Sequence, residues 1–268
     1  MKYLNLLFVL APVFILEACN KTEQLSVTLM HYNVGVFDKH EDSSIETIAC
    51  AVRELGADAV SLNEVDSCTF RTGQVDQMSA FAAEMGGWNC HYAAAMQYDG
   101  GAYGIGIASK PLLRIVSTDM VPLSKLDGQE PRVMAVVEYE DFVFASVHLD
   151  LTEMSQIGHV EAICRYADSL SCKVSKPMIL CGDFNCEPDS APIALMKQTW
   201  SLLTPESLTY PSDNPVKCID YIFMRHNGRT VSVKSAYISS ELSSVDLSTA
   251  SDHLPLAVSI TIMRGREQ

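Results

Sequence analysis

The chain has 268 residues, of which 48% are hydrophobic and 19% charged, and its formal net charge is -14. This apolar composition excludes a largely disordered chain, and the negative charge disfavours a polyanionic partner, which normally needs a basic patch. The length allows one large α/β domain or two small ones. We expect one domain, because no linker, repeat or low-complexity segment interrupts the sequence.

The first 19 residues predict an export signal. A single lysine precedes an apolar run that ends at Leu16 and is too short to span a membrane comfortably. The run closes with LEAC at 16–19, which resembles a bacterial lipobox, and this resemblance implies that Cys19 carries a lipid. We therefore expect an exported protein that is lipid-anchored to a bacterial membrane, with 20–26 as a tether and 27–264 as the folded domain. A plain signal peptide or an uncleaved anchor is the alternative.

Strand and helix patterns alternate irregularly along the rest of the chain. Residues 24–35 and 58–65 predict strands, and the helical spacing between them follows a Ser43 or Ser44 cap and stops at Gly56. Further strands are expected at 88–97, 104–109, 112–121, 131–140, 142–150, 179–185, 218–224, 231–239 and 254–262, with helices at 75–85, 155–171 and near 190–199 and a turn at 98–104.

Many strands with few helices between them favour two packed sheets with helices outside. The strict strand–helix alternation of a doubly wound sheet is missing from the pattern. The segment GGAYGIG at 100–106 is glycine-rich, but it leads into a strand, so it does not match a phosphate-binding loop that opens a helix.

Polar residues with acid–base or ligand chemistry recur in and after the apolar runs. They are Asn33, Glu64, His148, Asp183, Asn185 and Asp220, followed by Asp252 and His253 just before the last strand. Each alone has an ordinary explanation as a turn former, a helix cap or a hydrogen-bonded core residue. Together, carboxylates, carboxamides and imidazoles are what a hard divalent cation and a phosphoryl reaction require.

This ordered set resembles the endonuclease/exonuclease/phosphatase superfamily, which includes deoxyribonuclease I, inositol polyphosphate 5-phosphatases and neutral sphingomyelinases. The resemblance spans about 30–258 and is carried by GDFN at 182–185 and SDHLP at 251–255. The segments RTGQVDQ, YGIGIASK and PRVMAV resemble the superfamily's small hydrolase branch, while Asn63 stands where glutamine is usual. The resemblance implies a deoxyribonuclease I-like four-layer α/β sandwich of two mainly antiparallel sheets.

The resemblance also implies roles in metal-dependent phosphoester hydrolysis. Glu64 would be the principal Mg²⁺ or Mn²⁺ ligand, with Asn33 beside it, and Asp252 would ligate directly or through water. Asp183 would orient and deprotonate the attacking water. Asn185 would donate a hydrogen bond to a phosphoryl oxygen.

Two histidines complete the implied chemistry. His148 and His253 would stabilise the negative charge that develops on the phosphoryl group. Asp220 would hold His253 in one tautomer, because a catalytic imidazole needs a second group to fix it.

Three further residues are candidates for contacting the substrate phosphate. Arg71 and Arg132 match phosphate geometry because a guanidinium can bind two oxygens at once, although a structural arginine is an equal interpretation. Tyr103 is a candidate for lining the substrate cleft, with core packing as the alternative.

The cysteines show no framework. With Cys19 set aside, eight remain, without a CxxC pair or regular spacing. Cys181 and Cys218 each precede a candidate aspartate by two residues and would touch if their strands were neighbours. We expect reduced, buried thiols here rather than a disulfide.

We therefore expect a monomeric, Mg²⁺- or Mn²⁺-dependent phosphoesterase that hydrolyses a phosphodiester in a small-molecule or lipid-linked substrate. The alternative is a secreted nuclease acting on DNA or RNA, which the 19 Lys and Arg residues disfavour. A non-catalytic binding lipoprotein is a third, weaker hypothesis, because none of the principal motif residues is missing.

Overall fold

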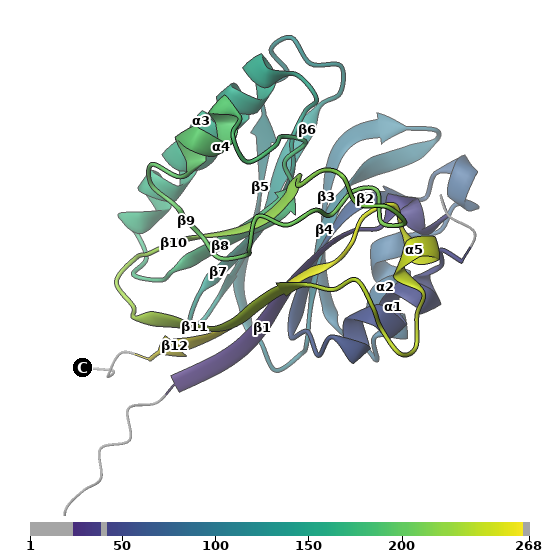
Figure 1. The fold of residues 1–268 in the computed structure, drawn as a ribbon, viewed down its shortest axis with the longest axis horizontal. Helices are drawn as coiled ribbons and strands as arrows, with labels where there is room; N and C mark the ends of the chain where they lie inside the picture. Colours follow the sequence, from purple (N-terminus) through teal and green to yellow (C-terminus); the bar gives the residue numbers. More distant parts are fainter. Residues whose placement is uncertain (1–23, 39–41, 265–268) are drawn as a thin grey trace, which may run out of the picture.

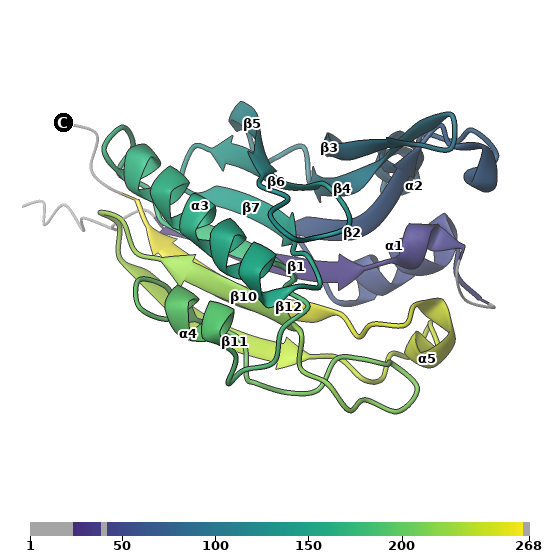
Figure 2. The ribbon, with the colours of Figure 1, turned by 90° about the horizontal axis from the view of Figure 1, so that it is seen from above.

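The computed structural model describes residues 24–38 and 42–264, and here twelve strands form two six-stranded sheets (Figures 1 and 2). The expected signal sequence and Cys19 lie outside the described residues. Strand β1 (Gln24–Asn33) includes the last three residues of the expected tether at 20–26.

The first sheet has the strand order β11-β12-β1-β2-β4-β3. Only β1 and β2 run parallel, and helix α1 (Ile45–Glu54) connects them. The other strands are β2 (Ala59–Ser67), β3 (Asn89–Tyr98), β4 (Gly101–Ser109), β11 (Val231–Ile238) and β12 (Leu256–Met263).

The second sheet has the order β5-β6-β7-β8-β10-β9 and repeats the arrangement of the first, with one parallel pair at its centre. Helix α3 (Glu153–Ser171) connects that pair, β7 and β8. The strands are β5 (Ile115–Leu123), β6 (Arg132–Tyr139), β7 (Val143–His148), β8 (Met178–Asp183), β9 (Ser201–Leu202) and β10 (Asp220–Arg225).

The molecule has four layers. Helices α1, α2 (Gln77–Glu84) and α5 (Leu247–Ala250) pack on the first sheet, and α3 and α4 (Ala191–Met196) cover the second (Figure 2). One apolar cluster fills the space between the sheets, and one lies under each helical layer. The predicted four-layer sandwich is therefore confirmed, and the sheets are mixed because each contains one parallel pair.

Several boundaries differ from the sequence prediction. The turn expected over 98–104 is only Asp99 and Gly100, with φ of 45° and 82°, so β4 already begins at Gly101. Two successive positive φ angles match the right-handed twist of a hairpin, which allows so short a connection. Strand β5 starts at Ile115 rather than 112, and β9 and α5 are too short to leave a periodic signal. Cys181 and Cys218 are free and buried, as expected.

The topology brings the chemistry to one end of the sandwich. The carboxyl ends of parallel strands lie at the same edge of a sheet, and the pairing aligns Asn33 with Asn63 and His148 with Asp183. Asp220, which begins the antiparallel β10, is also paired with Asp183. Chain segments far apart in sequence therefore meet at this edge.

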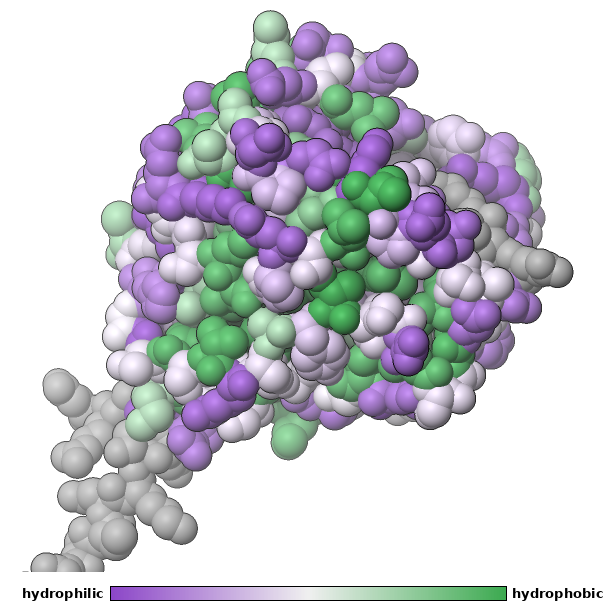
Figure 3. Space-filling view, viewed as in Figure 1, coloured by the Kyte–Doolittle hydropathy of each residue, from purple (hydrophilic) through white to green (hydrophobic). Residues whose placement is uncertain are grey.

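The surface is mixed rather than uniformly polar. Figure 3 shows hydrophobic residues gathered across the middle of one face, between hydrophilic residues that dominate its outline. None of the helices in the described part of the chain is both long and apolar enough to cross a membrane.

Candidate active site

A cavity of about 460 Å³ opens at this end of the sandwich. The sequence candidates that line it are Glu64, Arg71, Tyr103, Arg132, His148, Asp183, Asn185, Asp252 and His253. Asn33 and Asp220 are hydrogen-bonded to residues of this lining. The structure thus brings together every candidate that falls within the described residues.

A break in the strand directs Glu64 into the cavity. The pairing of β2 with β4 shifts register between Asn63 and Val65, and Glu64 between them has a φ of 56°. A bulge of this kind adds one unpaired residue and re-aims its side chain. The left-handed backbone at a non-glycine residue is a strain that recurs at functional sites.

Gly182 allows the carboxylate of Asp183 to sit where two strands approach closely. A Cβ atom at Gly182 would lie 1.9 Å from the carbonyl oxygen of Val147 on β7. Only glycine therefore fits, which supports clearance over a simple bend. Asn63 Oδ1 accepts a hydrogen bond from the backbone N–H of Asp183 at 2.9 Å and fixes the strand end.

Asn185 reaches the cavity through a turn and not by strand alternation. Strand β8 ends at Asp183, and Asn185 has a φ of 51°. Its backbone N–H donates to Asp183 Oδ1 at 2.8 Å, and its amide Nδ2 donates to the Leu149 carbonyl at 3.1 Å. The prediction that this strand continues to residue 185 is therefore wrong, although Asp183 and Asn185 do lie together.

Asp183 lies between two imidazoles. Its Oδ2 is 3.6 Å from Nε2 of both His148 and His253, and Asn33 Nδ2 donates to the same oxygen at 3.2 Å. Burial, followed by the nearby charge of Asp220, raises the pKa of Asp183 to about 7. A carboxyl group with such a pKa can gain and lose a proton near neutral pH.

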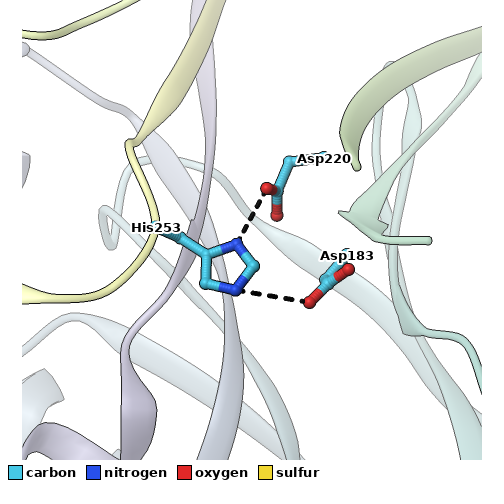
Figure 4. A group of neighbouring side chains, drawn as sticks. All are labelled: Asp183, Asp220 and His253. Atoms are coloured by element: carbon cyan, nitrogen blue, oxygen red, sulfur yellow. Dashed lines mark hydrogen bonds and ion pairs between the residues drawn. The ribbon is translucent and has the colours of Figure 1, made fainter. Parts of the chain in front are cut away.

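His253 is held by Asp220. Nδ1 donates to Asp220 Oδ2 at 2.8 Å, and Figure 4 shows the ring between Asp220 and Asp183. Burial opposes the positive charge on this ring, but the carboxylates of Asp220 and Asp183 outweigh it and raise the pKa of His253 to about 10. His253 is therefore placed to act as a cation.

His148 lies in the opposite situation. Its Nδ1 is buried and has no hydrogen-bond partner in the described part of the structure. Burial and, next, the positive charge of Arg132 hold the pKa of His148 well below its usual value. The imidazole is therefore neutral, and nothing among the described residues fixes its tautomer.

His31 is a functional neighbour that the sequence analysis missed. It is completely buried, and its Nε2 donates to Asp220 Oδ1 at 2.9 Å. Thr209 Oγ1 donates to the other oxygen, Oδ2, at 2.6 Å. The signal for His31 was its spacing of two from Asn33, which puts both side chains on one face of β1.

A buried polar network joins the two sheets below the cavity. Ser61 on β2 donates to Ser146 on β7 at 2.6 Å, and Asn63 Nδ2 donates to the same hydroxyl at 3.1 Å. His31 Nδ1 lies 3.3 Å from Ser61 Oγ. These contacts tie β1, β2 and β7 together beside the site.

Arg71 lines the cavity, but its guanidinium is already paired. Nε and Nη2 donate to the two oxygens of the buried Asp66 at 2.6 and 2.7 Å. The group also lies 4.5 Å from the ring centre of Tyr98 and 5.5 Å from that of Tyr103. These contacts favour the structural interpretation of Arg71.

Arg132 and Asp150 contain buried polar atoms without partners. Arg132 is 7% exposed and pairs through Nη2 with Glu130 at 3.2 Å, while its Nε has no partner among the described residues. Asp150 also lines the cavity, and its Oδ2 is likewise buried without a partner there. Unsatisfied buried groups are rare and point to a missing ligand or water.

Two groups of side chains could hold a cation. Asp183, Asp220 and His253 bring ligand atoms within 4.8 Å of one another, but Asp220 accepts hydrogen bonds on both oxygens. The other group is Asn33 and Glu64, in which Asn33 Nδ2 lies 3.3 Å from Glu64 Oε1. This oxygen-rich group fits Mg²⁺ or Mn²⁺ better.

Asn33 would have to turn its carboxamide over to join this group. Its Oδ1 at present accepts from the backbone N–H of Gly35 at 3.2 Å. A half-turn would direct the oxygen toward the Glu64 carboxylate, which is favourable only with a cation between them.

Two six-stranded sheets packed between helices, with carboxylates and imidazoles gathered at one end, define a protein of the deoxyribonuclease I-like fold. A family model described as "Endonuclease/Exonuclease/phosphatase family" matches residues 30–253. The chain belongs to this family, whose members are hydrolases acting on phosphate esters.

Solved structures share the fold. An endonuclease/exonuclease/phosphatase family protein from Bacteroides thetaiotaomicron is 18% identical with a TM-score of 0.70, covering 90% of this chain and 96% of its own. A mannosyl-6-phosphatase from the same organism is 18% identical with a TM-score of 0.70, and the match covers 87% of this chain and 99% of that protein. ANGEL2, a 2′,3′-cyclic phosphatase, is 15% identical with a TM-score of 0.68, and the match covers 89% of this chain and 95% of that protein. None of the curated proteins compared with the chain matched it.

Proposed function

We propose that the protein is a divalent-metal-dependent phosphoesterase that hydrolyses a phosphodiester in a small-molecule or lipid-linked substrate by attack of water on phosphorus. The observation that carries this proposal is the position of Asp183. Its carboxyl group lies 3.6 Å from each of two imidazoles and lines one cavity, and burial raises its pKa.

Asp183 would orient the attacking water and accept its proton. A positioned base contributes roughly 10²–10⁴-fold to such reactions. Its backbone is fixed by Asn63 and its carboxylate by the backbone N–H of Asn185, so it is held in place before the substrate arrives. This arrangement reduces the reorganisation needed to reach the transition state.

The remaining polar groups would stabilise the phosphoryl group. The cationic His253 would neutralise charge on the non-bridging oxygens, while His148 would serve as a neutral donor. The unpartnered Arg132 Nε and a remaining amide hydrogen of Asn185 can each donate to a phosphoryl oxygen. His148 and His253 lie on either side of Asp183, so the phosphoryl group would meet these donors beside the base.

Asn33 and Glu64 would hold the cation, with Asp252 contributing directly or through water. When bound, Mg²⁺ or Mn²⁺ supplies Lewis-acid stabilisation of the phosphoryl oxygens. The oxygen-rich donor set supports Mg²⁺ or Mn²⁺ over zinc, and no cysteine is found among the described residues that line the cavity.

Small substrates fit this cavity better than a polynucleotide. Three side chains along its described lining carry a permanent positive charge, Arg71, Arg132 and Lys217, and Arg71 is engaged by Asp66. A nucleic-acid groove normally presents a continuous basic stripe. Of the fold neighbours named above, one is described as a mannosyl-6-phosphatase and another as a 2′,3′-cyclic phosphatase.

The test is a substrate panel with Mg²⁺ or Mn²⁺: a bis-aryl phosphate, an aryl phosphate monoester, a phospholipid, sphingomyelin, a cyclic dinucleotide and plasmid DNA. We expect diester hydrolysis that EDTA abolishes, and an Asp183→Asn variant that folds but is inactive. Asp141→Asn, at an aspartate that pairs with Arg229 and Arg264 and is not part of the cavity lining, is the matched control for the same chemical change. Inactivity on the whole panel, or a fully active Asp183→Asn, would refute the proposal.

We also propose that the protein is exported and anchored through a lipid on Cys19, as a monomer. The support is the LEAC sequence at 16–19, which the structure does not describe. Labelled palmitate should be incorporated into the wild type and not into Cys19→Ala. Equal labelling of both proteins would contradict the anchor.

A further inference from the structure

Asp220 is surrounded by hydrogen-bond donors from three separate segments. Oδ1 accepts from His31 Nε2 at 2.9 Å. Oδ2 accepts from His253 Nδ1 at 2.8 Å and from Thr209 Oγ1 at 2.6 Å. Both histidine side chains and the carboxylate are almost completely buried, so water does not compete for these bonds.

We propose that His31 determines the role of Asp220: by occupying Oδ1, it keeps this carboxylate as the partner of His253 and prevents it from becoming a metal ligand. His31 would thus confine the cation to the Asn33–Glu64 group and leave a single metal site. The inference rests on the proposed metal-dependent function, but metal binding tests it without substrate.

The need for such a device follows from the geometry. Asp220 has a ligand atom within 4.8 Å of ligand atoms of Asp183 and His253. Two carboxylates and an imidazole so close together form a potential second cation site beside the first. A cation bound there would compete with Asp220 for the orientation of His253.

The three hydrogen bonds remove that possibility. A carboxylate has about four lone-pair sites, and rotation of Asp220 toward the cavity would break its bonds to His31 and Thr209. Without His31, Oδ1 would be a buried anionic oxygen with no donor, which is unfavourable and which a bound cation would relieve.

The role of His31 can be separated from its bulk by isosteric substitutions. In His31→Gln the amide Nε2 occupies the position of the imidazole Nε2 and can still donate to Asp220. In His31→Asn the amide nitrogen corresponds to Nδ1 and reaches only toward Ser61. His31→Leu supplies neither donor.

The experiment measures Mn²⁺ stoichiometry by isothermal titration and Mn²⁺–Mn²⁺ coupling by electron paramagnetic resonance. We expect one ion in the wild type and in His31→Gln, and a second, spin-coupled ion in His31→Leu and His31→Asn. The kcat of His31→Leu should fall on the order of 10–100-fold with little change in KM, because an outer partner is lost. His31→Gln should recover most of this loss.

Each result decides the question. A spin-coupled pair in the wild type, or one ion in every variant, would overturn the proposal. If His31→Leu does not fold, His31→Asn carries the test instead, because it keeps a polar side chain beside Ser61 but places no donor on Asp220 Oδ1, with His31→Gln as its control. If the substrate panel fails while the stoichiometry changes as described, only the proposed function is wrong.

Discussion

Two buried aspartates beside the same cavity differ in how completely their carboxylate oxygens are hydrogen-bonded. Asp220, 1% exposed, accepts hydrogen bonds from two histidines and a threonine on its two oxygens. Asp150, 2% exposed, accepts backbone N–H groups on Oδ1, at 2.6 Å from Leu151, and has no described partner on Oδ2. The two site histidines differ in the same way, because His253 Nδ1 is bonded to Asp220 and His148 Nδ1 has no partner among the described residues.

The difference separates the part of the site that is complete in the free protein from the part that a ligand completes. A fully bonded buried carboxylate is rigid and can orient a catalytic group. An unbonded buried oxygen costs stability, so it is tolerated where a substrate or water supplies the missing donor. We expect substitutions at Asp220 to affect kcat, and substitutions near Asp150 to affect KM.

Asp220→Asn should have the largest effect. The new amide presents N–H to His253 Nδ1 and favours the wrong tautomer, so kcat should fall on the order of 10³–10⁴-fold. The measurement is steady-state hydrolysis of the best panel substrate at saturating metal. Asp141→Asn, at an aspartate paired with Arg229 and Arg264 away from the cavity, is the control. A loss below about tenfold would mean that Asp220 does not orient His253.

The same pair should give the protein a pH-dependent stability. The pKa of His253 is raised from 6.5 to about 10, so its contribution is complete below about 6.5 and is lost as pH rises through 10. Burial raises the pKa of Asp220, but contacts with His253 and His31 outweigh burial and lower this pKa from 3.8. The contribution of Asp220 to stability is therefore lost as pH falls below 3.8.

Thermal unfolding in EDTA should therefore separate wild type from Asp220→Asn most between about pH 4 and 6.5. Breaking a buried ion pair costs about 3–5 kcal/mol, which corresponds to a difference in Tm on the order of 10 °C for a domain of this size. The difference should narrow steadily toward pH 10. A difference independent of pH would contradict the assigned ionisation.

The sequence predicted the layers, and its candidate residues do lie together, because both depend on local patterns. Strand periodicity placed the candidate residues near strand ends, and GDFN and SDHLP identified their family. His31 was missed since a histidine in an apolar strand resembles any core histidine until its partner, 189 positions away, is known. Thr209 lies in a loop whose conformation no short sequence pattern determines, and the pairing of Asp66, in β2, depends on the turn that carries Arg71.

Arg132→Lys should have a smaller effect that is confined to substrate binding. A lysine keeps the charge but loses the Nε–H donor, so KM should rise about tenfold or more while kcat changes little. Arg71→Lys is the matched comparison. Because Arg71 is already bonded to Asp66, its substitution should lower the Tm and leave KM nearly unchanged. Equal effects on KM would mean that both guanidiniums contact substrate.

Asp150→Asn should have the smallest effect on activity. Unlike the other substitutions, it should make the free protein more stable. The amide can keep Oδ1 as the acceptor for Leu151 while it removes an unpaired buried charge, so the free protein should be stabilised by about 1 kcal/mol. Substrate binding should weaken two- to tenfold, since the amide donates where the carboxylate accepted a ligand hydrogen. Thermal unfolding and KM measured on one preparation check both signs. A variant that is less stable with an unchanged KM would show that Oδ2 is satisfied by bound water and belongs, like Asp220, to the completed part of the site.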